Sequence, residues 1–169
     1  MEYRTVDHWE NLFRQCQREA FHLETRDSYR ELNEAERLQK FLNGEFPPDP
    51  NTPWQALMRE ITGRGVVVSR VRVVTEPHSD YQRWLLSVTV HNINAGEDIR
   101  YVPRDSVGDV PSDDWWLLDG EQVGYNLWDA DGNPVGIGLT TDPGIVEYCQ
   151  RARERLWVLA TPYAEYSAQ

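Results

Sequence analysis

The chain has few cysteines and little positive charge, and it contains no long apolar run. Its two cysteines, Cys16 and Cys149, lie far apart and match no metal-binding spacing. Two lone thiols in a chain of this size suggest a reducing compartment, and their apolar positions predict that both are buried. No apolar run approaches the ~18 residues of a membrane-spanning helix, and residues 1–12 lack the apolar core of a signal peptide. We therefore expect a cytoplasmic protein.

The charge is strongly negative. The chain has 28 Asp and Glu residues against 17 Lys and Arg residues, which gives a net charge of −11. Nucleic-acid and membrane surfaces carry phosphates, and phosphate binding depends on clustered Lys and Arg. This balance argues against direct binding to nucleic acid or membrane and favours a basic protein partner. Alternatively, the acidity serves only solubility.

The motifs of common catalytic sites are also missing. The sequence has no nucleophile elbow, paired-histidine helix or cysteine cluster. Gly63 and Gly65 precede a predicted strand, whereas a phosphate-binding loop follows a strand and opens a helix. The histidines are scattered, and a lone histidine is more often a surface or core residue than a ligand. We therefore expect no catalytic residue, no metal and no cofactor, although the sequence leaves the enzyme question open. The histidines are His8, His22, His78 and His91.

The composition is that of a globular protein with one core, since apolar residues make up 40% and aromatic residues 11%. The first third is predicted to be mainly helical. Apolar residues recur at helical spacing from Trp9 to Ala20. The mixed stretch 23–29 that follows is interpreted as an edge strand and a turn.

Two more helices are predicted before residue 66. Asn33 is placed to cap a helix that ends at Gly44. Prolines make residues 46–53 a stiff, extended connector. Thr52 then caps a third helix, with a proline at its first position and glycines from Gly63 at its end.

The rest of the chain predicts a sheet. The first strand, at 66–74, is expected to begin buried and to end with a wet face that carries Arg70 and Arg72. Ser79 is placed to cap a helix of at least two turns, while residues 84–93 fit both helix and strand. Asp142 and Pro143 open the last helix, and a loose tail follows at 161–169. Further strands are predicted at 99–103, 115–118, 123–128 and 135–139.

This order predicts a mixed α/β fold in a single domain. N-terminal helices are followed by β-α-β-β-β-α, which gives a mixed sheet of about five strands packed against helices. Residues 1–65 form the mainly helical part and residues 66–160 the mixed-sheet part.

Charged residues near strand ends suggest a ligand site, because ligand crevices in α/β sheets form at the C-terminal ends of strands. Glu76, His78 and Asp80 follow the first strand and could transfer protons. Glu97 and Asp98 are expected beside them. The alternative is that these residues cap helices and lock loops through ion pairs, with Glu76 bonded to Arg72 or Arg100. The candidate ligand-binding residues are Arg26, Arg72, Glu76, His78, Asp80, Tyr81, Glu97, Asp98 and Arg100.

Aromatic residues suggest an interface. Trp115 and Trp116 point to opposite faces of a strand, so one is expected in the core and the other on the surface. Exposed aromatics are common anchors of protein interfaces. Tyr163 and Tyr166 add apolar area to the polar tail. The alternative is that all four belong to an ordinary core.

Several motifs resemble an uncharacterised actinobacterial family of domains of unknown function. The resemblance covers nearly the whole chain, and it implies context only: members are often encoded beside helix-turn-helix regulators and small acidic partner proteins. The motifs are Phe21–Tyr29, Arg70–Pro77, Asp80–Tyr81, Ala95–Arg100, Val102–Arg104 and the helix opened by Asp142–Pro143.

The second half also resembles one half of a phospholipase-D-like domain. That family needs a His, a Lys two residues later and an Asp five residues after the Lys. If Asp119 takes the last position, Ser112 and Asp114 stand at the other two. The resemblance thus implies a relative that cannot form a phosphoryl-enzyme.

The sequence therefore favours a non-catalytic acidic interaction or regulatory protein, with a transcription regulator as its expected partner. The alternative is a small-ligand sensor or unrecognised enzyme with a polar site at the strand ends. A third possibility is a homodimer with a structural role. The sequence does not determine the ligand or the oligomeric state.

Overall fold

The computed structural model describes residues 1–29, 34–45 and 51–169. One mixed sheet runs through this part of the chain, in the order β1-β7-β6-β5-β2-β3-β4-β8. The strands are β1 (Glu2–Arg4), β2 (Glu19–Glu24), β3 (Val67–Val74), β4 (Glu97–Pro103), β5 (Trp115–Leu118), β6 (Gln122–Trp128), β7 (Pro134–Thr140) and β8 (Thr161–Pro162).

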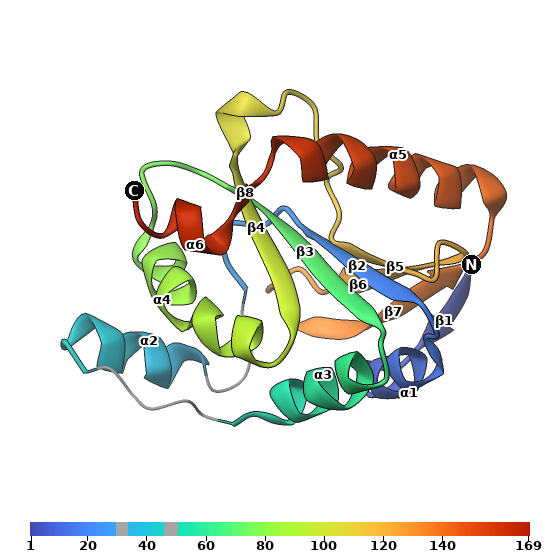
Figure 1. Cartoon of the computed structure of the whole chain (residues 1–169), viewed down its shortest axis with the longest axis horizontal. Helices are drawn as coiled ribbons and strands as arrows, with labels where there is room; N and C mark the ends of the chain where they lie inside the picture. The colour runs from blue at the N-terminus through green and yellow to red at the C-terminus, as the bar shows by residue number, and fades with distance from the viewer. Residues whose placement is uncertain (30–33, 46–50) are drawn as a thin grey trace.

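Helices cover both faces of the sheet (Figure 1). Helix α5 lies on one face, α1, α3 and α4 lie on the other, and α2 packs against α4. Within the described ranges, no helix is both long and apolar enough to cross a membrane. The helices are α1 (His8–Gln15), α2 (Glu34–Leu42), α3 (Pro53–Gly63), α4 (Asp80–Asn94), α5 (Pro143–Leu159) and α6 (Tyr163–Tyr166), with a short 3-10 helix at Arg104–Ser106.

The centre of the sheet is parallel and one side is antiparallel. Strands β2, β3 and β4 run parallel, and α4 connects β3 to β4. Strand β5 runs antiparallel to β2 and is followed by the antiparallel strands β6 and β7. Because of these directions, the ends of β2, β3 and β4, the start of β5 and the β6–β7 turn all lie at one end of the sheet.

Alternation along the central strands builds two cores. Phe21 and Val71 point toward α5, whereas Ala20 and Val68 point toward α1 and α3. All four side chains are buried, as expected when both faces of a strand are covered.

The helix starts agree with their sequence signals. Thr52 and Gln55 form the predicted capping box: the Thr52 hydroxyl accepts from the Gln55 amide at 3.2 Å, and the Gln55 side chain accepts from the Thr52 amide at 2.8 Å. Ser79 caps α4, and Asp142 caps α5. Helix α4 continues to Asn94, so the ambiguous residues 84–93 are helical.

The prediction of about five strands was wrong: among the described residues the sheet has eight strands, because the first 65 residues supply β1 and β2 and the tail supplies β8. The predicted first helix ends at Gln15, and Ala20 lies in β2. Strand β2 is central and not at an edge. Its side chains are buried on both faces, so it lacks the alternation that distinguishes a strand from a helix in sequence. Strand β1 is too short to show a pattern.

Two further predictions were wrong. Arg70 and Arg72 do not lie on a wet face: both are buried beneath the helices. The tail is not loose, because it forms β8 and α6 and buries Tyr166 against Tyr101. The predicted cap at Asn33 and the prolines between residues 46 and 50 lie outside the described residues.

Gly124→Ala should destabilise the protein by about 1–3 kcal/mol, because a methyl group there would overpack the core. A Cβ at Gly124 would lie 2.4 Å from an atom of the Trp9 ring. Gly63→Ala is the matched control, since a Cβ there meets nothing within 4 Å and alanine favours helix by up to about 1 kcal/mol. Urea denaturation measures the free energy of unfolding of both variants, and equal stability of the two would contradict the packing argument.

Candidate functional site

A cluster of buried charges ties the three parallel strands together, from the end of β2 through the middle of β3 to the start of β4. We call Glu24, Arg70, Arg72 and Glu97 the charged cluster. The Glu24 carboxylate accepts from Arg72 Nε and from Arg70 Nη1, each at 2.5 Å. Arg70 also donates to Glu97 Oε2 from Nη2 at 2.8 Å and from Nε at 3.1 Å. One continuous chain of ion pairs therefore crosses β2, β3 and β4.

Neighbouring groups complete the hydrogen bonding of the charged cluster. The Trp54 indole donates to the free oxygen of Glu97 at 2.6 Å. Arg72 Nη1 donates to the hydroxyls of Thr89 and Tyr101 at 2.6 and 2.8 Å. The two negative and two positive charges cancel, as a buried set of charges requires.

The electrostatics of the charged cluster favour the ionised forms. Burial alone would raise the pKa of Glu24, but Arg72 and Arg70 more than offset it and hold that pKa well below its usual range. Burial alone would lower the pKa values of the two arginines, but the facing carboxylates raise them. Glu24, Arg70 and Arg72 therefore stay charged across the physiological pH range.

His22 lies beside the charged cluster and is neutral. Its ring stacks on Trp116 with centroids 4.2 Å apart, and its Nδ1 is 3.5 Å from the Glu24 carboxylate. Neither ring nitrogen has a hydrogen-bond partner. Burial is the main cause that lowers the pKa of His22, and the charge of Arg70 lowers it further, against the smaller opposing effect of Glu24.

Asp114 fastens the start of β5 to the segment that follows β2. Its carboxylate accepts from the Thr25 amide at 2.7 Å, from the Thr25 hydroxyl at 3.0 Å and from the Tyr29 hydroxyl. Burial is the main cause that raises the pKa of Asp114. Arg104 donates to the Thr25 carbonyl, so the loop after β4 is held at the same place.

The loops anchored in this way carry a concentration of exposed acids. They follow β2 and β3, connect β4 to β5, and form the β6–β7 turn, all at one end of the sheet. Exposed carboxylates line every one of them, whereas the arginines among the described residues of these loops, Arg26 and Arg104, are half-buried. We call this surface the acidic end; its exposed carboxylates are Asp27, Glu76, Asp80, Asp105, Asp109, Asp113, Asp129 and Asp131.

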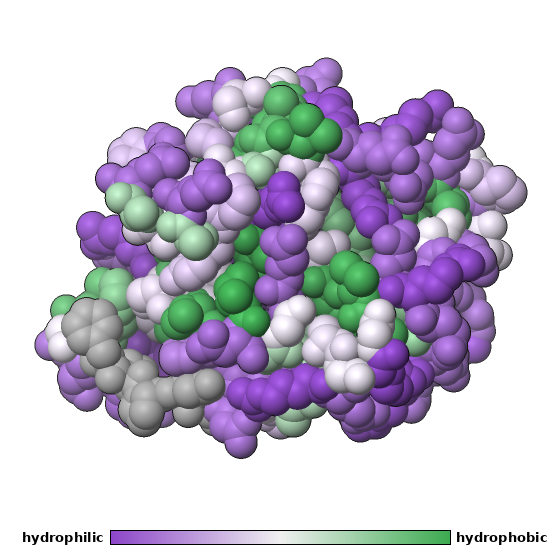
Figure 2. Space-filling model, viewed as in Figure 1, coloured by the Kyte–Doolittle hydropathy of each residue, from purple (hydrophilic) through white to green (hydrophobic). Residues whose placement is uncertain are grey.

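An apolar pair borders the acidic end. Arg155 of α5 donates to the carbonyls of Val107 and Asp109 at 2.7 and 2.6 Å, which places the β4–β5 loop against the C-terminal part of the helix. Val158 and Leu159 follow there with 83% and 50% exposure. Figure 2 shows an apolar area among hydrophilic residues where the C-terminal end of α5 lies in Figure 1.

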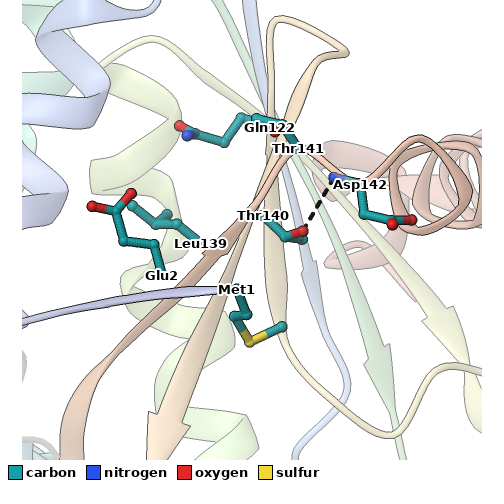
Figure 3. Close-up of a pocket in the computed structure, with 7 residues that line it drawn as sticks. All are labelled: Met1, Glu2, Gln122, Leu139, Thr140, Thr141 and Asp142. Carbon is teal, nitrogen blue, oxygen red and sulfur yellow. Dashed lines mark hydrogen bonds between the residues drawn. The ribbon is translucent and has the colours of Figure 1, made fainter.

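A hollow of about 310 Å³ lies away from the acidic end, at the start of α5 (Figure 3). The Asp142 carboxylate there accepts from the Gly144 and Ile145 amides, and its amide donates to Thr140. Asp142 therefore serves as the helix cap. The hollow is lined by Met1, Glu2, Gln122, Leu139, Thr140, Thr141 and Asp142.

The predicted ligand residues do not converge. Strand β4 starts with Glu97 opposite Val68, six residues before the end of β3, so Glu97 and Asp98 lie far along the strand from Glu76. Arg72 pairs with Glu24. The expected ion pair between Glu76 and Arg72 or Arg100 was therefore wrong.

The other members of that set lie in separate places. Arg100 lies 3.6 Å from the Asp98 carboxylate and covers the Trp157 ring. Arg26 lies over the Trp128 ring at 5.0 Å. Asp80 pairs with Arg83, and the Tyr81 hydroxyl donates to Glu34 at 2.8 Å.

Glu76 and His78 do come together, but around a residue from the tail. The Tyr166 hydroxyl donates to Glu76 at 2.5 Å and lies 2.9 Å from His78 Nε2. His78 Nδ1 lies 3.2 Å from the Thr75 carbonyl. This contact holds α6 on the loop after β3.

The tryptophans expected at an interface are core residues. Trp115 and Trp116 do point to opposite faces of β5, but both faces are covered, and their exposed fractions are 0% and 4%. Tyr166 is also buried, while Tyr163 is partly exposed beside Tyr101.

Sequence reasoning missed the acidic end and the buried role of Glu24 and Arg70. The acids of the β4–β5 loop and the β6–β7 turn stand in the sequence as ordinary polar loop residues. Only the alternation of strand directions brings them together with Asp27 and Glu76, so the available signal was the strand order and not a motif.

The fold is shared with solved structures whose sequences differ widely. TrmBL2, an archaeal chromatin protein with a novel mode of DNA binding, matches with a TM-score of 0.51 and 13% identity over 93% of this chain and 51% of TrmBL2. This chain therefore spans about half the length of TrmBL2. Nuc, a phospholipase D family member from Salmonella typhimurium, matches with a TM-score of 0.51 and 12% identity over 91% of this chain and 87% of Nuc.

The chain is thus a mixed α/β protein with a fold similar to that of a phospholipase D family member, and the likeness extends well beyond the second half. No curated protein matches it. It belongs to the family described as a domain of unknown function (DUF6879), whose model matches residues 7–168.

Glu24→Ala should lower the free energy of unfolding by about 3–5 kcal/mol, because it leaves two buried arginines with one carboxylate between them. Glu36→Ala is the control: it removes an exposed ion pair with Lys40 on α2, which is worth at most about 1 kcal/mol. Urea denaturation compares them, and a small effect of Glu24→Ala would refute the stabilising role of the charged cluster.

His22 should make stability depend on pH. Its pKa is lowered in the folded state, so the unfolded chain binds the proton first and stability is lost as pH falls below about 6.5, by up to about 1.4 kcal/mol per pH unit. Glu24, with its lowered pKa, contributes stability that is lost only at more acidic pH, below about 4.5.

His22→Phe should keep the stacking on Trp116 and flatten this dependence between about pH 7.5 and about pH 5.5. Denaturant unfolding at three pH values measures how the free energy of unfolding changes with pH. His8→Phe should retain the pH dependence of the wild type because His22 is unchanged. An identical slope in His22→Phe would exclude His22 as its source.

Proposed function

We propose that this protein is a non-catalytic interaction protein that binds a basic partner protein through the acidic end. The observation that carries the proposal is the gathering of eight exposed carboxylates at one end of the sheet, from separate loops, the short 3-10 helix and the start of α4. Complementary charge steers association and suppresses wrong partners. The apolar pair Val158 and Leu159 beside these acids suits a partner segment with one basic and one apolar face.

If Asp119 takes the last position of the phospholipase D motif, the residues that stand at its positions support a binding role. Asp114, where that motif has Lys, is buried and hydrogen-bonded to Thr25 and Tyr29. Asp119 accepts from the backbone amides of Gln17, Arg18 and Glu19. Both aspartates therefore hold the fold together.

We propose a basic transcription regulator of the helix-turn-helix class as the partner. TrmBL2, which shares the fold, binds DNA, but phosphates would be repelled by the acidic end of this chain. A regulator that binds DNA carries a basic face, which is the complement of the acidic end. Binding there would compete with DNA for that face.

The alternative of a ligand sensor with a site at the strand ends has less support. Arg72 and Glu97, the buried members of its expected site, are satisfied by other protein groups. The other members are spread over the loops after β2 and β3, the start of α4 and strand β4.

The quadruple variant D105N/D109N/D113N/D131N should weaken binding of an amphipathic Lys/Leu helical peptide by about tenfold or more, because each exposed charge contributes a few tenths of a kcal/mol. It should also reduce the dependence of binding on salt concentration. Fluorescence anisotropy of the labelled peptide measures both effects.

The control variant E60Q/E121Q/E147Q/E154Q removes the same charge from α3, α5 and the β5–β6 turn. It should change the affinity by less than about threefold. Equal losses in the two variants would show that net charge, and not the acidic end, attracts the peptide. The same pair of variants, tested with purified helix-turn-helix regulators and their operator DNA, addresses the proposed partner.

A further inference from the structure

Strand β1 lies at one edge of the sheet, next to the N-terminus in Figure 1. Its neighbour among the described strands is β7, with Glu2 opposite Leu139 and Arg4 opposite Ile137. All three residues of β1 are exposed. An exposed edge strand presents backbone donors and acceptors to another strand.

The sequence of β7 is adapted to hold β1 in place. A Cβ on Gly136 would lie 2.8 Å from the Arg4 carbonyl oxygen, and a Cβ on Gly138 would lie 2.9 Å from the Met1 sulfur. At Gly136 the neighbouring atom belongs to the backbone and cannot move aside, so only glycine lets β1 approach β7 this closely there. The edge is therefore a built part of the fold.

Apolar side chains gather along this edge. Met1 and Tyr3 are 62% and 68% exposed. Val6 and Val135 are 40% and 57% exposed, and the β1–β7 register continues toward both. Met1 and Tyr3 alternate with Glu2 and Arg4 and so lie on one face of β1, where they add exposed apolar area to the free edge.

The sequence of β1 is complementary to itself. Glu2 and Arg4 flank Tyr3 symmetrically and pair with each other within the chain. In an antiparallel pairing centred on Tyr3, Glu2 of one copy faces Arg4 of the other, and the two tyrosines meet. Opposite charges across a strand pair stabilise it, and like charges destabilise it.

We propose that β1 pairs edge to edge with β1 of a second copy, forming a two-fold symmetric dimer with one continuous sheet. Each copy contributes the same patch, as an isologous interface requires. Strand β1 contains none of the carboxylates of the acidic end, so this proposal does not rest on the proposed function. Because the paired strands are short, the dimer is a weak one.

The test reverses one charge of β1 in each of two variants, R4E and E2R. Sedimentation velocity follows association from about 10 µM to about 1 mM, a range that covers weak dimers. R4E presents two acids and E2R presents two arginines, so each variant alone should be monomeric where the wild type dimerises. An equimolar mixture should form the heterodimer, because every Glu then faces an Arg.

Rescue in the mixture separates loss of the interface from loss of folding. Y3K should also give a monomer, whereas V67K, which replaces another exposed apolar residue at the start of β3, should dimerise as the wild type does. A monomeric wild type at every concentration would overturn the proposal. Dimerisation of R4E alone, or failure of the mixture to associate, would overturn it as well.

Discussion

The structure depends on the pairing of Glu24 and Glu97 with Arg70 and Arg72 beneath the helices. Charges removed from water are tolerated only when each has a partner, and losing one partner leaves the others uncompensated. These pairs join β2, β3 and β4, which are distant in sequence, and so fix the parallel centre of the sheet.

The position of the loops follows from this centre. With β2, β3 and β4 aligned, and Asp114 bonded to Thr25, the loops after the strands are held at one end of the molecule. Their carboxylates stay in water, where negative charges side by side cost little. The buried charges of the cluster sum to zero, so the net negative charge of the protein lies on its surface. The proposed docking of a basic partner uses only this surface.

Local signals predicted much of the secondary structure. The β-branched run of β3, the capping box at Thr52 and the Asp142–Pro143 start of α5 each depend on residues close in sequence, and each prediction was confirmed. The error at the end of the first helix arose because the same apolar spacing fits a helix and a buried strand. Ala20 continues the helical spacing of α1 but belongs to β2. A three-residue strand such as β1 carries no pattern and is defined by its pairing with β7.

The sequence by itself determined the negative charge, the mixed α/β class, the helix caps and the buried cysteines, because composition and short-range contacts settle these properties. Only the tertiary structure decided that Arg70 and Arg72 are buried, that both tryptophans of β5 lie in the core, and that scattered loop acids share one end. These outcomes depend on strand order and direction, and strand pairing joins residues that no sequence window contains together.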